Sequence, residues 1–157
     1  MSILTATSDD FAGRLLPNGT YRVTVLDAKI ETTENGERLT RMYGNIRRAA
    51  DDAVEFTNDG EAVPFRIGNR KLFARSWITH TNEQAQSIGQ REIKREAVSA
   101  GLMAQPKGSE TVELNVDEAY ASALLGREVV VRTQQKPRDK AQPDGEKDAV
   151  VVAWVKA

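Results

Sequence analysis

The fold is decided by the stretch Thr20-Tyr21-Arg22-Val23-Thr24-Val25-Leu26-Asp27-Ala28-Lys29-Ile30-Glu31-Thr32-Thr33. Alternation of apolar and polar residues is typical of a strand with one buried face. The apolar residues here fall into two sets of opposite parity, Tyr21, Val23 and Val25 and then Leu26, Ala28 and Ile30. The buried face therefore switches midway, which predicts a strand that bends or bulges between the two halves of a closed barrel.

The rest of the chain predicts four more strands and two helices. Asn35-Gly36 predicts a hairpin turn, since both residues tolerate positive φ. Thr81 with Gln84 three residues later predicts a helix start, and Gly101 predicts its end. We expect strands at Thr20–Thr33, Glu37–Arg48, Lys71–Thr79, Glu128–Lys136 and Asp148–Lys156, and helices at Glu83–Ala100 and Asp117–Leu125.

This order predicts a mainly β protein with one longer and one shorter helix. Three strands, a helix and two further strands, with a first strand that changes face, is the order of an OB-type five-stranded barrel. The 157 residues suit one domain. Within it, residues 1–16 are expected to be a loose N-terminal segment and residues 49–68 an inserted acidic loop with a possible hairpin of its own.

The third expected strand carries the clearest functional pattern, in Arg70-Lys71-Leu72-Phe73-Ala74-Arg75-Ser76-Trp77-Ile78. Alternate side chains of a strand share a face, so Phe73, Arg75 and Trp77 are expected together. Aromatic rings stack on unpaired bases and a guanidinium binds the neighbouring phosphate, which indicates single-stranded nucleic acid.

The competing interpretation makes Phe73 and Trp77 part of the core, which is the usual place for aromatic residues of a strand. Arg75 between them favours the stacking platform, because a sealed apolar core does not accept an unpaired cation. The opposite parity, with Leu72, Ala74 and Ile78, can then form the core. The second strand repeats the pattern, with Met42 and Ile46 on one parity and Arg41, Tyr43 and Arg47 on the other.

Net charge is only −1, but the cations are segregated. The ranges 38–48 and 66–80 each hold four Lys or Arg residues and no acid. Such blocks create a local positive field whatever the total charge, although charge runs on ordinary surfaces also bind nothing. We interpret Arg91, Lys94 and Arg95, on the outer face of the longer helix, as solvated surface.

The composition argues against several other classes. With 39% hydrophobic and 29% charged residues the sequence is an ordinary globular one, without an apolar run of membrane-spanning length. The N-terminus does not resemble a secretory signal and Cys is absent, so we expect a cytoplasmic protein. His80 is the only histidine, glycine-rich phosphate loops are missing, and the pairs Asp9-Asp10 and Asp51-Asp52 are typical of solvated loops. We expect no enzyme activity, no metal and no cofactor.

Several segments resemble a phage family of single-stranded-DNA-binding proteins. They are Leu16-Pro17-Asn18-Gly19-Thr20-Tyr21, Val25-Leu26-Asp27-Ala28, Glu34-Asn35-Gly36, Ile88-Gly89-Gln90-Arg91-Glu92-Ile93, Ala100-Gly101-Leu102 and Leu125-Gly126-Arg127-Glu128-Val129-Val130-Val131. The resemblance covers most of Leu16–Lys156 and implies binding and protection of single-stranded DNA in phage replication or recombination. It also implies replication or recombination proteins as partners, inside the infected host cell.

This chain departs from that family in two places. The segment between the second and third strands is longer and more acidic than the resemblance implies. Many replication proteins of this kind also end in an acidic tail that recruits partners, whereas Val155-Lys156-Ala157 directly follows the last expected strand. Such a tail is therefore either absent or was removed.

The predicted DNA-binding residues combine both patterns. Phosphate contacts are expected from Arg41, Arg47, Arg70, Lys71, Arg75 and Arg132, and base stacking from Tyr43, Phe73, Trp77 and Trp154. Trp154 shares its parity with Lys156, and a tryptophan that covers one end of the barrel is an equal alternative for it. The alternative function is an OB-type protein-interaction module without a nucleic-acid ligand, in which the aromatic face is the hot spot.

Overall fold

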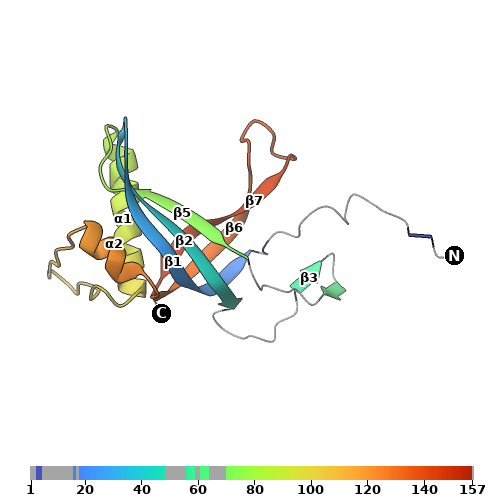
Figure 1. Cartoon of the computed structure of the whole chain (residues 1–157), viewed down its shortest axis with the longest axis horizontal. Helices are drawn as coiled ribbons and strands as arrows, with labels where there is room; N and C mark the ends of the chain where they lie inside the picture. The colour runs from blue at the N-terminus through green and yellow to red at the C-terminus, as the bar shows by residue number, and fades with distance from the viewer. Residues whose placement is uncertain are drawn as a thin grey trace.

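The computed structural model describes residues 3–4, 16, 18–48, 56–58, 61–63 and 70–156. In this part of the chain an antiparallel sheet of five strands, in the order β5-β2-β1-β6-β7, packs against two helices, and β3 pairs with β4 separately (Figure 1). The elements are β1 (Gly19–Thr33), β2 (Gly36–Arg48), β3 (Phe56–Asn58), β4 (Glu61–Val63), β5 (Leu72–Trp77), α1 (Glu83–Ser99), α2 (Glu118–Leu124), β6 (Glu128–Pro137) and β7 (Lys147–Val155).

The mainly β class, the two helices and their order along the chain are confirmed. The hairpin β3–β4 falls in the segment predicted as an inserted acidic loop. The remainder of that segment, most of the predicted loose segment 1–16 and both pairs of adjacent aspartates lie outside the described residues.

The face switch predicted in β1 is confirmed. Val23 and Val25 are fully buried, whereas Ala28 and Ile30 pack against the core from the opposite parity. The pairing of β1 with β2 shifts register between Val25 and Asp27, because Leu26 is bulged out of the ladder. Leu26 is 39% exposed, so the expectation that it joins the buried set is wrong. The bulge lets β1 bend and pair with β2 on one side and β6 on the other.

The β1–β2 turn differs by one residue from the prediction. Glu34 and Asn35 form the turn, and Gly36 already pairs with Thr33 at a φ of +150°. A Cβ atom on Gly36 would lie 2.1 Å from the carbonyl oxygen of Thr79. Both this close approach and the positive φ therefore favour glycine at position 36, as the first residue of β2 and not as part of the two-residue turn.

Helix α1 is fixed at its start by a side-chain cap. Asn82, and not Thr81 as predicted, accepts hydrogen bonds from the backbone N–H groups of Gln84 and Ala85. Gly89 has no room for a Cβ, which would lie 2.4 Å from backbone atoms of Trp77. The helix can therefore lie directly against the end of β5, with Ile93 and Ala97 in the core.

Strands β5 and β7 approach each other but share no ladder, so the curved sheet stays open between them. Helix α1 contacts both strands. The core lies between the inner face of the sheet and α1. Two hairpins, β1–β2 and β6–β7, project from the same side of the molecule (Figure 1).

Candidate functional site

The outer surface of strands β2 and β5 carries the aromatic and basic residues that the sequence predicted. Its cross-strand pairs are Arg38 with Trp77, Thr40 with Arg75 and Met42 with Phe73. We call these six residues the β2–β5 face. Phe73 is 64% exposed and Arg75 is exposed, because their neighbours Leu72, Ala74 and Ser76 point into the core. Ile78, expected in the core with Leu72 and Ala74, lies beyond the strand, where it is half-buried and packs against the core.

Trp77 is held in a defined position at one end of this face. The centroid of its ring lies 4.4 Å from that of His80, at an interplanar angle of 67°. The guanidinium of Arg38 lies over the same ring, 5.9 Å from its centroid, and Arg38 also pairs with Glu31 at 3.6 Å. Trp77 is therefore half-buried, with a cation already beside its π face.

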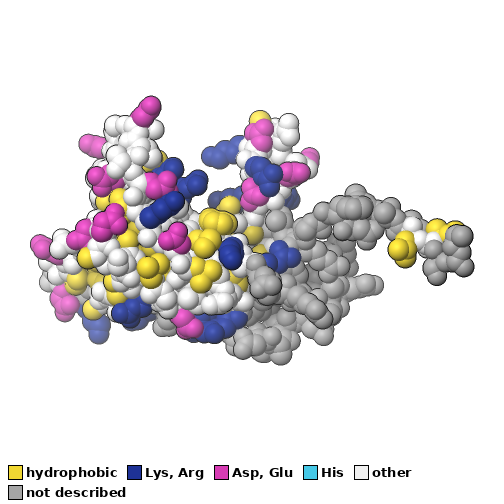
Figure 2. Space-filling view, viewed as in Figure 1, with side chains coloured by type: hydrophobic (Ala, Val, Ile, Leu, Met, Phe, Trp, Pro, Cys, Tyr) yellow, Lys and Arg dark blue, Asp and Glu magenta, His cyan; other side chains and the backbone are white. Residues whose placement is uncertain are grey.

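A cavity of about 660 Å³ opens where β5 and β7 fail to pair. Arg70, Lys71, Phe73 and Arg75 line one side of it, and Asp148 with Ala149 and Val150 line the other. In the view of Figure 2, Lys and Arg side chains lie beside apolar ones in the hollow between the two projecting hairpins.

Among the described residues that line this cavity, three are cations and one, Asp148, is a carboxylate. The Asp148 carboxylate is already paired with Arg138 at 2.8 Å, and the hydrogen bond from Arg138 lowers the pKa of Asp148. Asp148 therefore faces Arg138, and the positive charge of Lys71 and Arg75 lies on the opposite side of the cavity.

Arg41 and Tyr43 require a correction. Both were expected to bind DNA, and both are fully buried on the inner face of β2. Nε of Arg41 lies 3.0 and 3.1 Å from the two carboxylate oxygens of Glu96 on α1. Its Nη1 donates to the carbonyl of Leu39 and to the hydroxyl of Ser76, each at 3.0 Å. These groups hold Arg41 inside the protein, away from any ligand on the surface.

Trp154 and Tyr43 complete this buried network. The indole Nε1 of Trp154 donates to the Tyr43 hydroxyl at 3.0 Å, and that hydroxyl donates to Glu96. Trp154 is only 5% exposed, and its ring lies 4.9 Å from the Arg41 guanidinium. Of the two alternatives for Trp154, the structure therefore shows the buried one.

The protonation states of the network follow from its burial and charges. Burial by itself lowers the pKa of Arg41, but the Glu96 carboxylate more than offsets this and raises that pKa above its ordinary value. Burial raises the pKa of Tyr43, and the negative charge of Glu96 raises it further, against the opposing effect of Arg41. Arg41 therefore stays charged and Tyr43 stays a hydrogen-bond donor over the ordinary pH range.

The remaining predicted cations separate in space. Arg47 is exposed and pairs with Glu128 of β6, near Arg22, which lies 3.9 Å from the same carboxylate. Arg132 lies on β6 in a different groove. The predicted set thus contributes Arg70, Lys71, Phe73, Arg75 and Trp77 to one surface, and Arg38, Thr40 and Met42 are residues of that surface that the sequence reasoning missed.

Comparison of the sequence with models of known protein families gave no match, and comparison with curated proteins gave none. Among the described residues no group of three or more His, Cys, Asp or Glu side chains is arranged to hold a metal ion. Neither α1 nor any other described helix has the length and apolar character needed to cross a membrane.

Proposed function

We propose that this protein binds single-stranded DNA on its β2–β5 face. The observation that carries the proposal is an aromatic ring, Phe73, held 64% exposed beside Arg75 and in line with Trp77, in the lining of a cavity whose described residues include three cations. Exposure of so large an apolar side chain costs free energy in an isolated protein, and a ligand with flat apolar faces and negative charge offsets that cost.

The arrangement of the strands supports an OB-type barrel. The order β5-β2-β1-β6-β7 becomes the OB ring if β5 and β7 close on each other, and α1 lies in the chain between β5 and β6. OB-type proteins bind oligonucleotides with the face of their second and third strands, flanked by two loops. In this chain those strands are β2 and β5, and the flanking connections are the β1–β2 turn and the β6–β7 loop (Figure 1).

The proposed mechanism combines base stacking on aromatic rings with phosphate contacts from basic side chains. Phe73 and Trp77 stack on bases, while Arg70, Lys71 and Arg75 contact the phosphates on either side of them. None of these contacts needs to read the edge of a base, so binding is independent of sequence. The protein acts by coating the strand and does not catalyse a reaction on it.

The choice of DNA and of the biological setting comes from the resemblance to phage single-stranded-DNA-binding proteins. On that basis we place the activity in phage DNA replication or recombination, in the cytoplasm of the infected host. Replication or recombination proteins are then the expected protein partners. The alternative, a protein-interaction module, is favoured only by the exposure of Phe73, which also suits a hot spot.

The dependence of binding on salt tests the proposal against that alternative. We expect an oligo(dT) single strand to bind more tightly than the matching duplex, with an affinity that falls steeply as salt rises. Arg75→Ala should reduce the magnitude of the log–log salt slope by about one unit, since one phosphate contact is lost. Arg127→Ala, which removes another exposed arginine, is the matched control and should leave the slope unchanged. A flat salt response of the wild-type protein would favour the interaction module.

Phe73→Ala separates ligand contact from folding. Because Phe73 is largely exposed, its loss should leave the melting temperature nearly unchanged. Binding of oligo(dT) should weaken by about 1–3 kcal/mol, which is the range for one base stacked on an aromatic ring. Leu125→Ala is the control, since Leu125 is also a large apolar residue with 48% exposure but lies outside the β2–β5 face. Equal oligonucleotide affinities for the two variants would contradict the stacking role of Phe73.

A further inference from the structure

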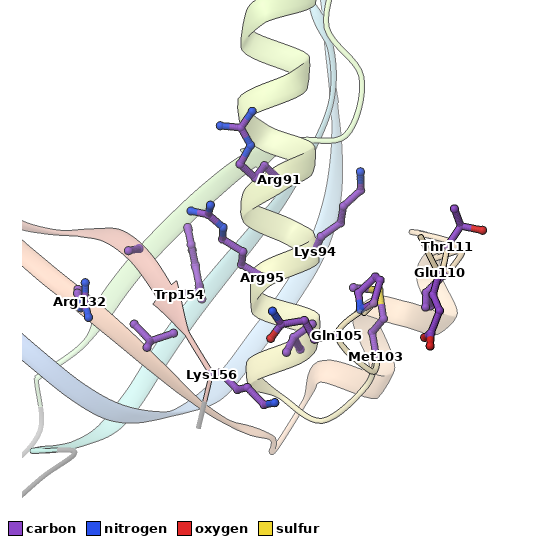
Figure 3. A pocket seen from close by; sticks show the side chains of 15 residues that line it. Arg91, Lys94, Arg95, Met103, Gln105, Glu110, Thr111, Arg132, Trp154 and Lys156 are labelled. Carbon is purple, nitrogen blue, oxygen red and sulfur yellow. The ribbon is translucent and has the colours of Figure 1, made fainter. Parts of the chain in front are cut away.

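A second groove, of about 620 Å³, lies between α1 and the strands β6 and β7 (Figure 3). Five basic residues line it, three from α1, one from β6 and one directly after β7, and Glu110 is the one acidic residue among the described residues that line it. The five are Arg91, Lys94, Arg95, Arg132 and Lys156. Figure 3 shows Arg91 and Arg95 pointing from α1 toward the β6–β7 side.

Arg91 and Arg95 extend over the groove, whereas Lys94 extends from the opposite side of α1 and lies at the edge of the groove (Figure 3). Within the described part of the chain none of the five has an ion-pair partner within 4.0 Å, whereas Arg138 and Arg47 on other surfaces do. Like charges held around one groove repel each other, so their position favours occupation by an anionic ligand.

The floor of the groove is aliphatic. Its apolar lining consists of Val98, Met103, Pro106, Val112, Ala153 and Val155. Trp154 contributes little to the surface of the groove, because it is only 5% exposed and its indole N–H donates to Tyr43. The groove thus offers no aromatic face on which a base could stack, unlike the β2–β5 face.

We propose that this groove binds an acidic peptide segment of a partner protein, one that carries an aliphatic side chain among its carboxylates. Carboxylates pair with the arginines around the groove, and the aliphatic side chain covers Val98, Met103 and Val155 on its floor. The groove shares no lining residue with the β2–β5 face or with its cavity. The peptide and a nucleic-acid strand can therefore be bound independently.

The two tryptophans allow each site to be followed separately, because Trp77 lies on the β2–β5 face and Trp154 lines the groove. In the Trp77→Phe protein, Trp154 is the one remaining tryptophan. The probe is a synthetic fluorescein-labelled peptide in which glutamates flank a pair of leucines. We expect this peptide to change the emission of Trp154 and to bind with saturable fluorescence anisotropy. The same peptide with serines in place of the leucines should bind more weakly, because the aliphatic floor is then left uncovered.

Charge reversal distinguishes this site from the proposed DNA site. Arg95→Glu should weaken peptide binding by about tenfold or more, since it replaces an attraction by a repulsion, and should leave oligo(dT) affinity within about twofold. Arg75→Glu is the matched control and should do the opposite. The proposal is overturned if the wild-type protein does not bind the peptide, or if Arg95→Glu lowers oligo(dT) affinity as much as Arg75→Glu does. The second outcome would make the groove part of a nucleic-acid path. Because the peptide measurement needs no DNA, a failure of the proposed DNA binding would be seen separately.

Discussion

Glu96→Leu is expected to lower the free energy of unfolding by about 3–5 kcal/mol, because it leaves the buried guanidinium of Arg41 without its counter-charge. Both side chains are fully buried, and the pair links β2 to α1 across the core. Denaturant unfolding followed by circular dichroism measures this loss as a lower midpoint. Glu113→Leu is the matched control, since Glu113 is exposed, and its effect should stay within about 0.5 kcal/mol.

A double variant identifies the cause of the loss. With Arg41→Leu and Glu96→Leu combined, no charge remains buried at this point, so most of the lost stability should return. The recovery should be incomplete, because the Tyr43 hydroxyl then loses Glu96 as its acceptor. If the double variant is as unstable as the sum of the two single variants, the cost is one of packing, and the electrostatic explanation fails.

The mainly β class and the order of the elements were predictable because their signals are local, whereas the predicted closure of the barrel is not seen, since β5 and β7 do not pair. Alternation along β1 predicted the bend at Val25, and the structure places a bulge at that point. Five strands and two helices lie within two residues of their predicted bounds. The details that were predicted wrongly, such as the role of Gly36, depend on contacts between residues that are far apart in the sequence. Gly36 begins β2 rather than lying in the turn, and its close approach to Thr79 is a contact that no local pattern of the hairpin encodes.

The candidate site was predictable only in part. Alternation shows which residues of a strand share a face, and this brought Phe73, Arg75 and Trp77 together. It does not show which face points inward. In β2 the core took the parity of Arg41 and Tyr43, because a carboxylate 55 residues further along the chain neutralises Arg41. Glu96, within the apolar stripe of α1, was the available signal that a buried cation faces that helix.

The basic groove escaped prediction for a related reason. Arg91, Lys94 and Arg95 are an ordinary solvated stripe when α1 is considered alone. Their significance depends on Arg132 and Lys156, which other strands bring to the same groove. Convergence of charges from several elements is a property of tertiary packing, which the spacing within one helix cannot reveal.

The two tryptophans are expected to respond oppositely to truncation. Trp154→Ala should cost about 3–5 kcal/mol of stability, because it leaves a large cavity beside Arg41 and removes the hydrogen-bond donor to Tyr43. Trp77→Ala removes a half-buried ring at the surface, so it should disturb folding less. It should instead weaken oligo(dT) binding by about 1–3 kcal/mol through the loss of one stacked base.

Replacing each tryptophan by phenylalanine tests the same difference between Trp77 and Trp154 by fluorescence, a measurement that does not depend on protein stability. In the Trp154→Phe protein, Trp77 is the one remaining tryptophan, and oligo(dT) should quench its emission by direct stacking. In the Trp77→Phe protein the emission comes from Trp154, which is 5% exposed and lies at a different groove from the β2–β5 face, so oligo(dT) should cause little quenching. Affinity measured by anisotropy of a labelled strand confirms that both proteins are saturated. Strong quenching in the Trp77→Phe protein would move the DNA path to the Trp154 side of the molecule and remove the β2–β5 face as the site of stacking.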